Sequence, residues 1–504
     1  MMSKSRILLQ AGTLLLHNEQ NHVIPTVADL LIKGQFIDKI SKDIQVDSET
    51  KVVDCSGKVI SPGFVDTHRH LWQSQYKGIH ANHTLIEFIP TGNYSGGLWT
   101  KEDLFWGQLA GALESIDAGT TTVIDHSSCN PSSDHPQAAI QAVLTAGLRE
   151  VYCYMPTRRL VSTNPWKVED DFFSEQNLST YRELARAGPY GNGLVHIGYA
   201  MDNIYVPGEI LKPYYANLRD LAKGKAKVIT THTGDGALLG SSPTAVQILN
   251  GHGLLGPDIL LSHATSPHEG DGALYKKSGA FVSSTANTEL QMGTMPVALR
   301  EDHYDNASIG VDCHSWGASG IPEQMRMTLQ AARAERGRKL ADKGLWSRHT
   351  GFDVEKVFNL GTIGGAKAAG LEGEIGSLKE GMKADILIFD STSPSMLVAA
   401  DENPVAAIVL HSNPSDIEMV LIDGVIRKAE GKLLDVTVAA APVESKSIIG
   451  PGRKLTWKDI ARGVKESRLS ILEKVKDIDF KSGEEYVIRS MYMDTKTMLE
   501  NQKV

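Results

Sequence analysis

The chain has few cysteines for its length. Four occur in 504 residues, and no two of them form a CxxC pair (Cys55, Cys129, Cys153, Cys313). A disulfide framework requires a denser set of cysteines, as in small secreted proteins. We therefore expect a reducing compartment and place the protein in the cytoplasm.

Long apolar runs are missing as well. No segment reaches the roughly 18 consecutive apolar residues that span a bilayer. The apolar stretch near the N-terminus is interrupted by Gln10, Gly12 and His17, so it falls short of the about 7–15 unbroken apolar residues of a signal peptide. We expect no membrane partner.

A surplus of basic residues is also absent. Lys and Arg total 51 against 60 Asp and Glu, which gives a formal net charge of −9. A mildly acidic chain does not attract a phosphate backbone, so we expect no nucleic-acid partner. Hydrophobic residues make up 41% of the chain, which is enough for a large core and excludes a disordered protein.

Short apolar runs rich in β-branched residues alternate with helical stretches between residues 61 and 372. Their number and spacing are typical of a (β/α)₈ TIM-like barrel, an α/β fold of about 250 residues. The eight runs are Gly63–Thr67, Thr121–Asp125, Glu150–Tyr154, Leu194–Tyr199, Val228–Thr231, Ile259–Ser262, Ala280–Ser283 and Ser308–Val311.

Strand patterns also occur at both ends of the chain, outside the barrel. Residues 1–60 and 373–440 contain short apolar runs separated by polar and glycine-containing turns. We therefore expect a composite β-sandwich domain built from both chain ends, with the barrel inserted between its two parts. Residues 441–504 are charged and predict a C-terminal helical extension that serves packing or oligomer contact.

Polar residues with metal-binding side chains lie where the predicted strands end. His68 and His70 end the first run and point to the same side of an extended segment. His232, His263 and Asp312 end the fifth, sixth and eighth runs. A single histidine at a strand end is usually a satisfied polar residue, but five such groups at one barrel mouth are improbable by chance. Imidazoles and a carboxylate are ligands of Zn²⁺, Fe²⁺ and related ions.

One metal ion is favoured over two. Binuclear barrels of this kind usually bridge their ions with a carboxylated lysine at the end of strand four or an acid at the end of strand three. The segment Gly193–Asp202, which contains the fourth run, has no lysine, and the third run closes with Tyr154-Met-Pro156.

The segment Pro62-Gly-Phe-Val-Asp-Thr-His-Arg-His70, the later metal-binding residues and the segment Gly376–Asp385 resemble the amidohydrolase superfamily. More narrowly, residues 5 to 435 are similar to its chlorohydrolase and purine/pyrimidine-deaminase branch, which includes guanine, 8-oxoguanine and cytosine-like deaminases. The resemblance implies a distorted barrel with a composite sandwich and one divalent ion, Zn²⁺ or alternatively Fe²⁺. It also implies that this ion is held by His68, His70, His232 and Asp312.

The resemblance extends to the substrate pocket. It implies that His263 binds the attacking water or the substrate. The segment His70-Leu-Trp72-Gln73 is similar to the stretch of guanine-like deaminases whose glutamine contacts the heterocycle. Trp72 offers a stacking face there and Gln73 offers amide hydrogen bonds; the alternative is that Trp72 packs beneath a loop and Gln73 faces solvent.

The chain departs from this branch at the proton shuttle. Deaminases of the branch usually carry a glutamate three residues after the strand-five histidine, whereas this chain reads His232-Thr-Gly-Asp235. Glu289, in the loop after the seventh run, is a second candidate acid. Asp312, after taking a proton from water, is the third.

These observations predict a mononuclear metal-dependent hydrolase that acts on a carbon–nitrogen bond other than a peptide bond. We expect hydrolytic deamination of a small nitrogen heterocycle; the alternatives at the same metal are amide or lactam hydrolysis, dechlorination and decarboxylation. A non-catalytic scaffold has no use for the convergent ligands. We also expect a homo-oligomer, a dimer or a tetramer.

Overall fold

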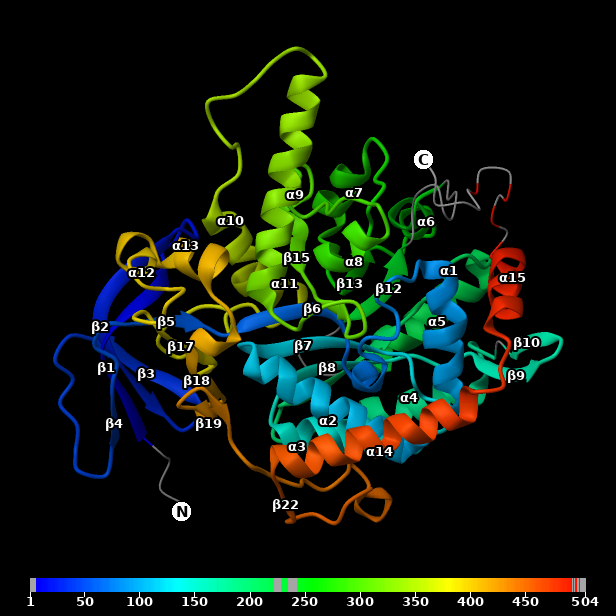
Figure 1. Cartoon of the computed structure of the whole chain (residues 1–504), viewed down its shortest axis with the longest axis horizontal. Coiled ribbons are helices and arrows are strands. Elements are labelled where there is room, and N and C mark those ends of the chain that lie inside the picture. The colour runs from blue at the N-terminus through cyan, green and yellow to red at the C-terminus, as the bar shows by residue number, and fades with distance from the viewer. Residues whose placement is uncertain are drawn as a thin grey trace.

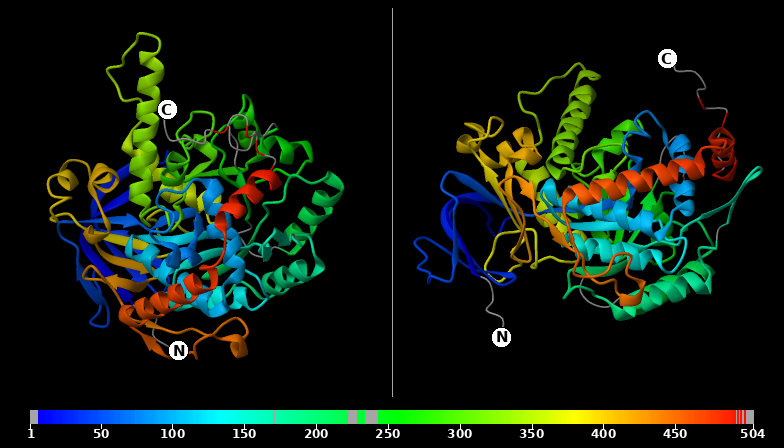
Figure 2. Two further views of the ribbon diagram at one scale, coloured as in Figure 1. Left: turned by 45° about the vertical axis from the view of Figure 1, so that its right-hand side comes forward. Right: turned by 60° about the horizontal axis from the view of Figure 1, so that its bottom comes forward.

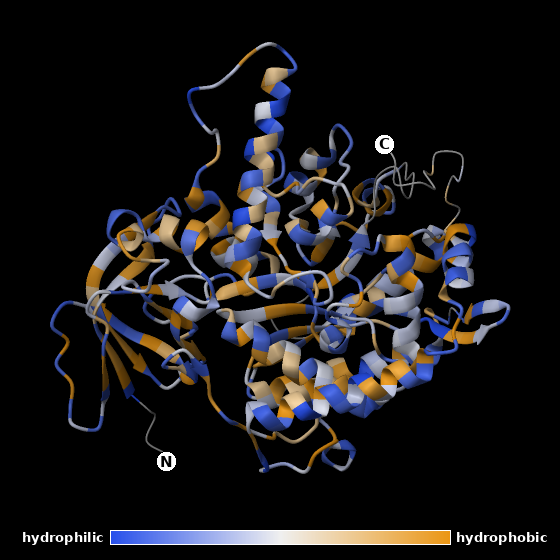
Figure 3. Cartoon of the chain, viewed as in Figure 1, coloured by the Kyte–Doolittle hydropathy of each residue, from blue (hydrophilic) through white to orange (hydrophobic). Residues whose placement is uncertain are grey.

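The computed structural model describes residues 6–169, 171–221, 228–233 and 243–491, together with residues 493, 495 and 498. Two large sheets organise these residues: a sheet at the N-terminal end and a central sheet surrounded by helices (Figure 1). Apolar residues are prominent on the strands of both sheets (Figure 3). No helix within these ranges is long and apolar enough to cross a lipid bilayer.

The central sheet consists of parallel strands in the spatial order β15-β14-β13-β12-β11-β8-β7-β6-β16. Only two residues, Gly310 and Val311, separate β15 from β16, so the chain joins the two ends of this order and the sheet closes on itself. The predicted α/β barrel is confirmed, and each predicted run falls on one of its strands. The strands are β6 (Phe64–His70), β7 (Thr120–Ser127), β8 (Arg149–Tyr154), β11 (Val195–Ala200), β12 (Ile229–Thr233), β13 (Ile259–His263), β14 (Phe281–Ser284), β15 (Ala307–Ile309) and β16 (Asp312–Cys313).

The interruption between β15 and β16 has a steric cause. A Cβ atom on Gly310 would lie 2.7 Å from the backbone nitrogen of His68, so only glycine fits at this crossing. The backbone N–H of Val311 donates to the buried carboxylate of Asp66 at 3.0 Å instead of to a neighbouring strand. Asp312 then adopts a φ of 70°, which is uncommon for a residue with a side chain. The break places Asp312 beside the end of β6.

Helices cover the outer face of the barrel (Figures 1 and 2). Helix α2 (Lys101–Asp117) begins where the Thr100 hydroxyl accepts a hydrogen bond from the Asp103 N–H, and the Asp103 carboxylate accepts one from the Thr100 N–H in return. It ends before Gly119, whose φ is 87°. The other long helices are α3 (His135–Ala146), α4 (Glu175–Ala187), α5 (Gly208–Leu221), α9 (Ile321–Ala341), α14 (Trp457–Val475) and α15 (Phe480–Ser490).

The second sheet draws strands from both chain ends, as predicted for the composite domain. Its spatial order is β20-β19-β18-β17-β5-β1-β2-β3, with β4 beside β1. Only Gly63 separates β5 from the first barrel strand, β6. The strands are β1 (Arg6–His17), β2 (Val23–Lys33), β3 (Phe36–Ser41), β4 (Lys51–Asp54), β5 (Lys58–Pro62), β17 (Ile386–Asp390), β18 (Ile417–Ile422), β19 (Val425–Ala429) and β20 (Lys432–Leu433).

The C-terminal extension packs on the chain's own barrel. Helix α14 lies along α2, and the Ser467 hydroxyl donates to the Asp103 carboxylate at 2.6 Å. The Arg468 guanidinium donates to the carbonyls of Gln75 and Lys77 at 3.0 and 2.8 Å. Helix α15 contacts the segment 89–94. The extension therefore holds the loop that follows β6.

Candidate metal centre

Four side chains that can bind a metal meet at the carboxyl-terminal ends of the barrel strands. His68 and His70 end β6, His232 lies on β12 and Asp312 begins β16. One ligand atom of each lies within 4.8 Å of the others. The structure thus brings together the four residues that the resemblance assigned to one ion.

The Nε2 atoms of the three histidines face this common point. His70 Nε2 lies 3.2 Å from His232 Nε2 and 3.2 Å from Asp312 Oδ1. His68 Nε2 lies 3.4 Å from the same Asp312 oxygen and has no hydrogen-bond partner although it is buried. Buried polar nitrogens rarely lack a partner, so this arrangement fits a cation between them.

The opposite nitrogen of each ring is held by an oxygen atom. Nδ1 of His68 lies 2.8 Å from the Ser262 hydroxyl, and Nδ1 of His70 lies 2.7 Å from the carbonyl of His126. Nδ1 of His232 lies 2.9 Å from the Asp202 carboxylate. A hydrogen bond donated from Nδ1 leaves Nε2 as the lone-pair atom, which is the tautomer that binds a metal.

The electrostatics also suit a cation. Burial lowers the pKa of His68 well below its ordinary value, so its ring is neutral. Burial alone would raise the pKa of Asp312, but the adjacent imidazoles of His68 and His70 outweigh burial and lower that pKa well below its ordinary value. Burial would lower the pKa of His70, but Asp312 outweighs burial in turn and raises it. Three imidazoles and a carboxylate form a donor set typical of Zn²⁺ or Fe²⁺. The residues present therefore fit a divalent ion.

His263 lies at the edge of this group. Its Nε2 is 4.0 Å from Asp312 Oδ2, and its Nδ1 is 2.9 Å from the Thr285 hydroxyl and 3.7 Å from Glu289 Oε1. Its φ of 75° places it among the uncommon backbone conformations that collect at functional sites. The ring can approach a molecule bound over Asp312 without being a ligand itself.

Glu289 lies on the short helix α8 (Ala286–Gln291) and is buried. Its Oε1 accepts a hydrogen bond from the Thr285 N–H at 2.8 Å, whereas its Oε2 has no partner. Burial raises its pKa above the ordinary value. Asp235, the candidate acid that follows His232 in the sequence, lies outside the described residues.

Asp202 is a site residue that the sequence analysis missed. It follows β11, and its carboxylate accepts from the N–H of His232 at 2.9 Å and lies 3.4 Å from His126 Nε2. The imidazole of His126 lies against that of His232, with ring centroids 4.0 Å apart. An acid directly after the fourth strand run follows the same rule that identified the ligands, so its position alone could have indicated it.

The two residues expected in the substrate pocket differ in their surroundings. The Trp72 indole packs edge-on against Trp99, with ring centroids 4.9 Å apart, and lies in the barrel's hydrophobic core. Trp72 is 1% exposed, and these contacts favour the alternative that it packs beneath a loop. The Gln73 side chain is fully buried, and its amide interacts with the Cys313 thiol but has no nitrogen or oxygen partner. Gln73 therefore does not face solvent.

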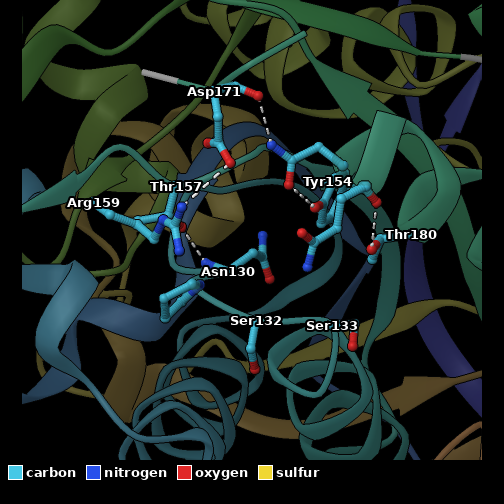
Figure 4. Close-up of a pocket in the computed structure, with 11 residues that line it drawn as sticks. Asn130, Ser132, Ser133, Tyr154, Thr157, Arg159, Asp171 and Thr180 are labelled. Carbon is cyan, nitrogen blue, oxygen red and sulfur yellow. Dashed lines mark hydrogen bonds and ion pairs between the residues drawn. The ribbon is translucent and has the colours of Figure 1, made fainter. Parts of the chain in front are cut away.

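A polar pocket lies beside the mouth, between the loops after β7 and β8 and the start of α4 (Figure 4). Asn130, Tyr154, Thr157 and Asn177 are among the residues that line it. The Asn130 amide already donates to two backbone carbonyls, at 2.7 and 3.1 Å, and accepts from the Tyr152 hydroxyl at 2.7 Å. None of the predicted site residues lines this pocket. The candidate metal site is therefore the histidine cluster and not this pocket.

Comparison with known proteins places this geometry among hydrolases. The model of the amidohydrolase family matches residues 59–427. The chain is 26% identical over 428 residues to 5-methylthioadenosine/S-adenosylhomocysteine deaminase of Thermococcus onnurineus, covering 81% of this chain and 91% of the relative. It is 26% identical over 448 residues to 5'-deoxyadenosine deaminase of Methanosarcina mazei, covering 85% and 94%.

Two solved structures share the fold and were determined with zinc. An adenosine deaminase from Xanthomonas campestris matches with a TM-score of 0.74 at 16% identity, covering 93% of this chain and 98% of that chain. Atrazine chlorohydrolase from Arthrobacter aurescens matches with a TM-score of 0.73 at 18% identity, covering 92% and 100%.

Proposed function

Because the chain belongs to the amidohydrolase family, as its motifs predicted, we propose that it removes the exocyclic amino group of a nitrogen heterocycle as ammonia. The reaction is the hydrolysis of a carbon–nitrogen bond other than a peptide bond. Water supplies the oxygen of the product and one proton to the amino group, which leaves as ammonia, while the second proton of water stays on the product. Curated relatives that cover most of the chain are named as deaminases.

The observation that carries the proposal is the convergence of three histidine Nε2 atoms and Asp312 within 4.8 Å, each histidine oriented through its other nitrogen. We propose that His68, His70, His232 and Asp312 hold one divalent ion, with Zn²⁺ as first choice because zinc occurs in the structures of similar fold. Such an ion supplies Lewis acidity, which makes water a nucleophile near neutral pH.

Asp312 and His263 act on the water in this scheme. The Asp312 carboxylate is ionised and accepts the proton of the attacking water. His263, with Nε2 4.0 Å from Asp312 Oδ2 and Nδ1 held by Thr285, orients the water or the developing oxygen. Both groups lie on fixed strand ends, so neither must reorganise during the reaction.

A proton must also reach the heterocycle and the departing nitrogen. Asp312 can return the proton that it took from water. Glu289 is a second donor, because burial raises its pKa and its Oε2 has no other partner. Asp235 stays a candidate for the same role. A general acid contributes roughly 10²–10⁴-fold to such a step.

We propose an adenine nucleoside as the substrate class. The relatives are named for 5-methylthioadenosine, S-adenosylhomocysteine and 5'-deoxyadenosine. In this chain, the Gln73 amide is buried without a nitrogen or oxygen partner, and a purine edge offers both a donor and an acceptor to such an amide.

The test is ammonia release by the zinc-loaded chain from 5'-deoxyadenosine, 5-methylthioadenosine, adenosine, guanine, cytosine and atrazine. We expect ammonia from at least one adenine nucleoside, and a loss of about 10³-fold or more in kcat for Asp312→Asn because an amide cannot accept the water proton. Metal content is measured in parallel. A metal-loaded chain that releases no ammonia from the whole panel, or releases only chloride from atrazine, would contradict deamination.

A further inference from the structure

The outer half of α9 and the loop that follows it project from the body of the protein (Figures 1 and 2). We call residues 333–349 the arm. Near its tip lie two apolar side chains, Leu345 and Trp346, and Trp346 is 82% exposed. Tryptophan is usually mostly buried, so its place at the end of a projection indicates a surface that another molecule covers.

The arm also differs in charge from the rest of the chain. It contains six basic and two acidic residues, a net charge of +4, whereas the whole chain carries −9 (basic Arg333, Arg336, Arg338, Lys339, Lys343, Arg348; acidic Glu335, Asp342). Both acids are already paired, Glu335 with Lys339 at 2.7 Å and Asp342 with Arg338 at 2.9 Å. Within the described ranges, Lys343 and Arg348 next to Trp346 form no ion pair. The arm tip therefore suits a partner surface that is apolar and acidic.

The chain itself presents such a surface around helix α12 (Ala399–Glu402). Leu397 and Val398 are exposed there, Val398 to 69%. Asp401 and Glu402 are exposed beside them, and in the part of the chain that the structure describes neither carboxylate forms an ion pair. We call these four residues the α12 patch.

Val398 carries a second indication of a contact. Its φ is 68° and its ψ is −43°, a strained conformation for a β-branched residue. Strain of this kind persists where the surroundings or a function require it. Here it turns an apolar side chain outward into solvent instead of into the core.

The arm and the α12 patch lie on the same side of the molecule. In both views of Figure 2, as in Figure 1, the loop of the arm descends on the side of α9 that faces α12 and α13 (Pro404–Ala406). A single two-fold axis can therefore relate two copies so that each supplies both surfaces, the commonest symmetry of homo-oligomers.

We propose that the arm is a dimerisation device whose partner is a second copy of this chain. Leu345 and Trp346 of one copy pack on Leu397 and Val398 of the other, and Lys343 and Arg348 face Asp401 and Glu402. The contact occurs twice. Tryptophan and arginine are the residues most enriched among interface side chains that dominate binding.

The experiment measures the mass of the zinc-loaded full chain by sedimentation over a wide range of concentrations. We expect a dimer for the natural chain. Trp346→Asp and Val398→Asp should each raise the dimer Kd by about 30-fold or more. The matched control is Trp457→Asp, because Trp457 is also half exposed, at 50%, but lies on α14; it should leave the Kd unchanged. Melting temperatures check that each variant is folded.

Charge reversal tests the pairing itself. Lys343→Glu and Asp401→Lys should each weaken the dimer, and the double variant should recover much of the loss because the ion pair is restored with exchanged signs. A natural chain that stays monomeric at all concentrations would overturn the proposal, as would a dimer that both aspartate variants leave intact. Binding of a monomeric chain to phosphatidylserine vesicles that Trp346→Asp abolishes would instead assign the arm to an anionic membrane.

Discussion

Two groups of buried polar residues on neighbouring barrel strands differ in what their atoms face. The mouth cluster lies at the carboxyl ends of the strands and consists of His68, His70, His232 and Asp312. The wall cluster lies between β7, β8 and α2 and consists of Gln108, Asp125 and Glu150. Burial is therefore common to both groups and cannot by itself distinguish a reactive site.

The difference lies in where the hydrogen bonds go. In the wall cluster, the Gln108 amide donates to Asp125 at 2.7 Å and to Glu150 at 3.2 Å. Burial raises the pKa of Glu150 well above its ordinary value, and the neighbouring Asp125 raises it further, so the two acids share a proton. In the mouth cluster the hydrogen bonds run outward and leave the inward atoms for a ligand. Atoms without a hydrogen-bond partner occur in the wall cluster too, at Gln108 Oε1 and Glu150 Oε2. The convergence of several ligand atoms on one point therefore marks the site.

The largest expected effect follows from replacing two of the histidines whose Nε2 atoms face the metal position in the mouth cluster. His68→Ala combined with His70→Ala should abolish stoichiometric metal binding and lower kcat/KM by at least about 10⁴-fold, because the lost ion supplied the activation of water. Elemental analysis and ammonia release measure the two effects. His135→Ala is the control, since His135 is buried and hydrogen-bonded to Trp99 but lies outside both clusters. Equal metal content in the double variant would refute the metal site.

Asp202 connects the mouth cluster to its surroundings, and its replacement should have the next largest effect. Asp202→Ala frees Nδ1 of His232, which the carboxylate holds at 2.9 Å. Partners of this kind typically contribute 10–100-fold to metal affinity. Asp202→Asn should lose less, because an amide oxygen still accepts the hydrogen bond.

Competition with a chelator measures the zinc Kd of both Asp202 variants. Zinc affinity should rise in the order Asp202→Ala, Asp202→Asn, natural chain. This order would show that the carboxylate acts by orienting His232 and not through a general loss of stability. Equal affinity for all three proteins would show that His232 needs no support from Asp202.

The sequence predicted the barrel and the mouth cluster because both rest on local patterns. Strand runs end at the barrel mouth, so the residues at their ends converge whatever the details of packing. Trp72 shows the limit of such patterns. It follows the ligands directly, yet the position of Trp99 and α2, far along the chain, makes it a core residue.

The pairing of Asp202 with His232 also depended on tertiary structure. The strand-end rule gives Asp202 a position, but only the packing of β11 beside β12 shows that its carboxylate meets the imidazole. The same holds for the arm. Helical stretches were expected between residues 61 and 372, whereas the projection of α9 from the body depends on what packs against it (Figure 1).

Replacing two buried glutamines, Gln73 after β6 and Gln108 in the wall cluster, tests the difference between the two clusters. Gln73→Leu should lower kcat/KM by a factor that corresponds to a loss of about 1–3 kcal/mol of transition-state stabilisation, because a ring edge of the substrate loses its partner. The melting temperature should change little, since the Gln73 amide interacts with the Cys313 thiol, which is a weak hydrogen-bonding group, and has no nitrogen or oxygen partner to lose. Gln108→Leu is the matched control and should do the reverse: it lowers the melting temperature by leaving Asp125 and Glu150 unpaired but affects kcat/KM less. An unchanged kcat/KM for Gln73→Leu would remove this residue from the site.

The smallest effect is expected at the wall cluster and concerns stability alone. Glu150 holds its proton more tightly in the folded chain than in the unfolded chain, because burial and Asp125 raise its pKa. The folded state therefore binds more protons, and the stabilisation is complete below the ordinary pKa of glutamate, about 4.3, and is lost as the pH rises toward the folded value. Glu150→Gln keeps an uncharged side chain at every pH and can still donate to Asp125.

Urea unfolding of the zinc-loaded proteins between pH 5 and 8 measures this difference. Relative to Glu150→Gln, the natural chain should lose up to about 1.4 kcal/mol of unfolding free energy for each pH unit within this window. Metal binding depends on pH in both proteins alike, so its contribution cancels in the difference. The variant should also deaminate at nearly the natural rate, because the hydrogen bonds described for the wall cluster run to Gln108 and to the backbone of Leu71 and not to a metal-binding atom. If the unfolding free energies of the two proteins depend on pH in parallel, Glu150 is ionised in the folded chain. A large loss of activity in Glu150→Gln would show that the wall cluster contributes to the reaction.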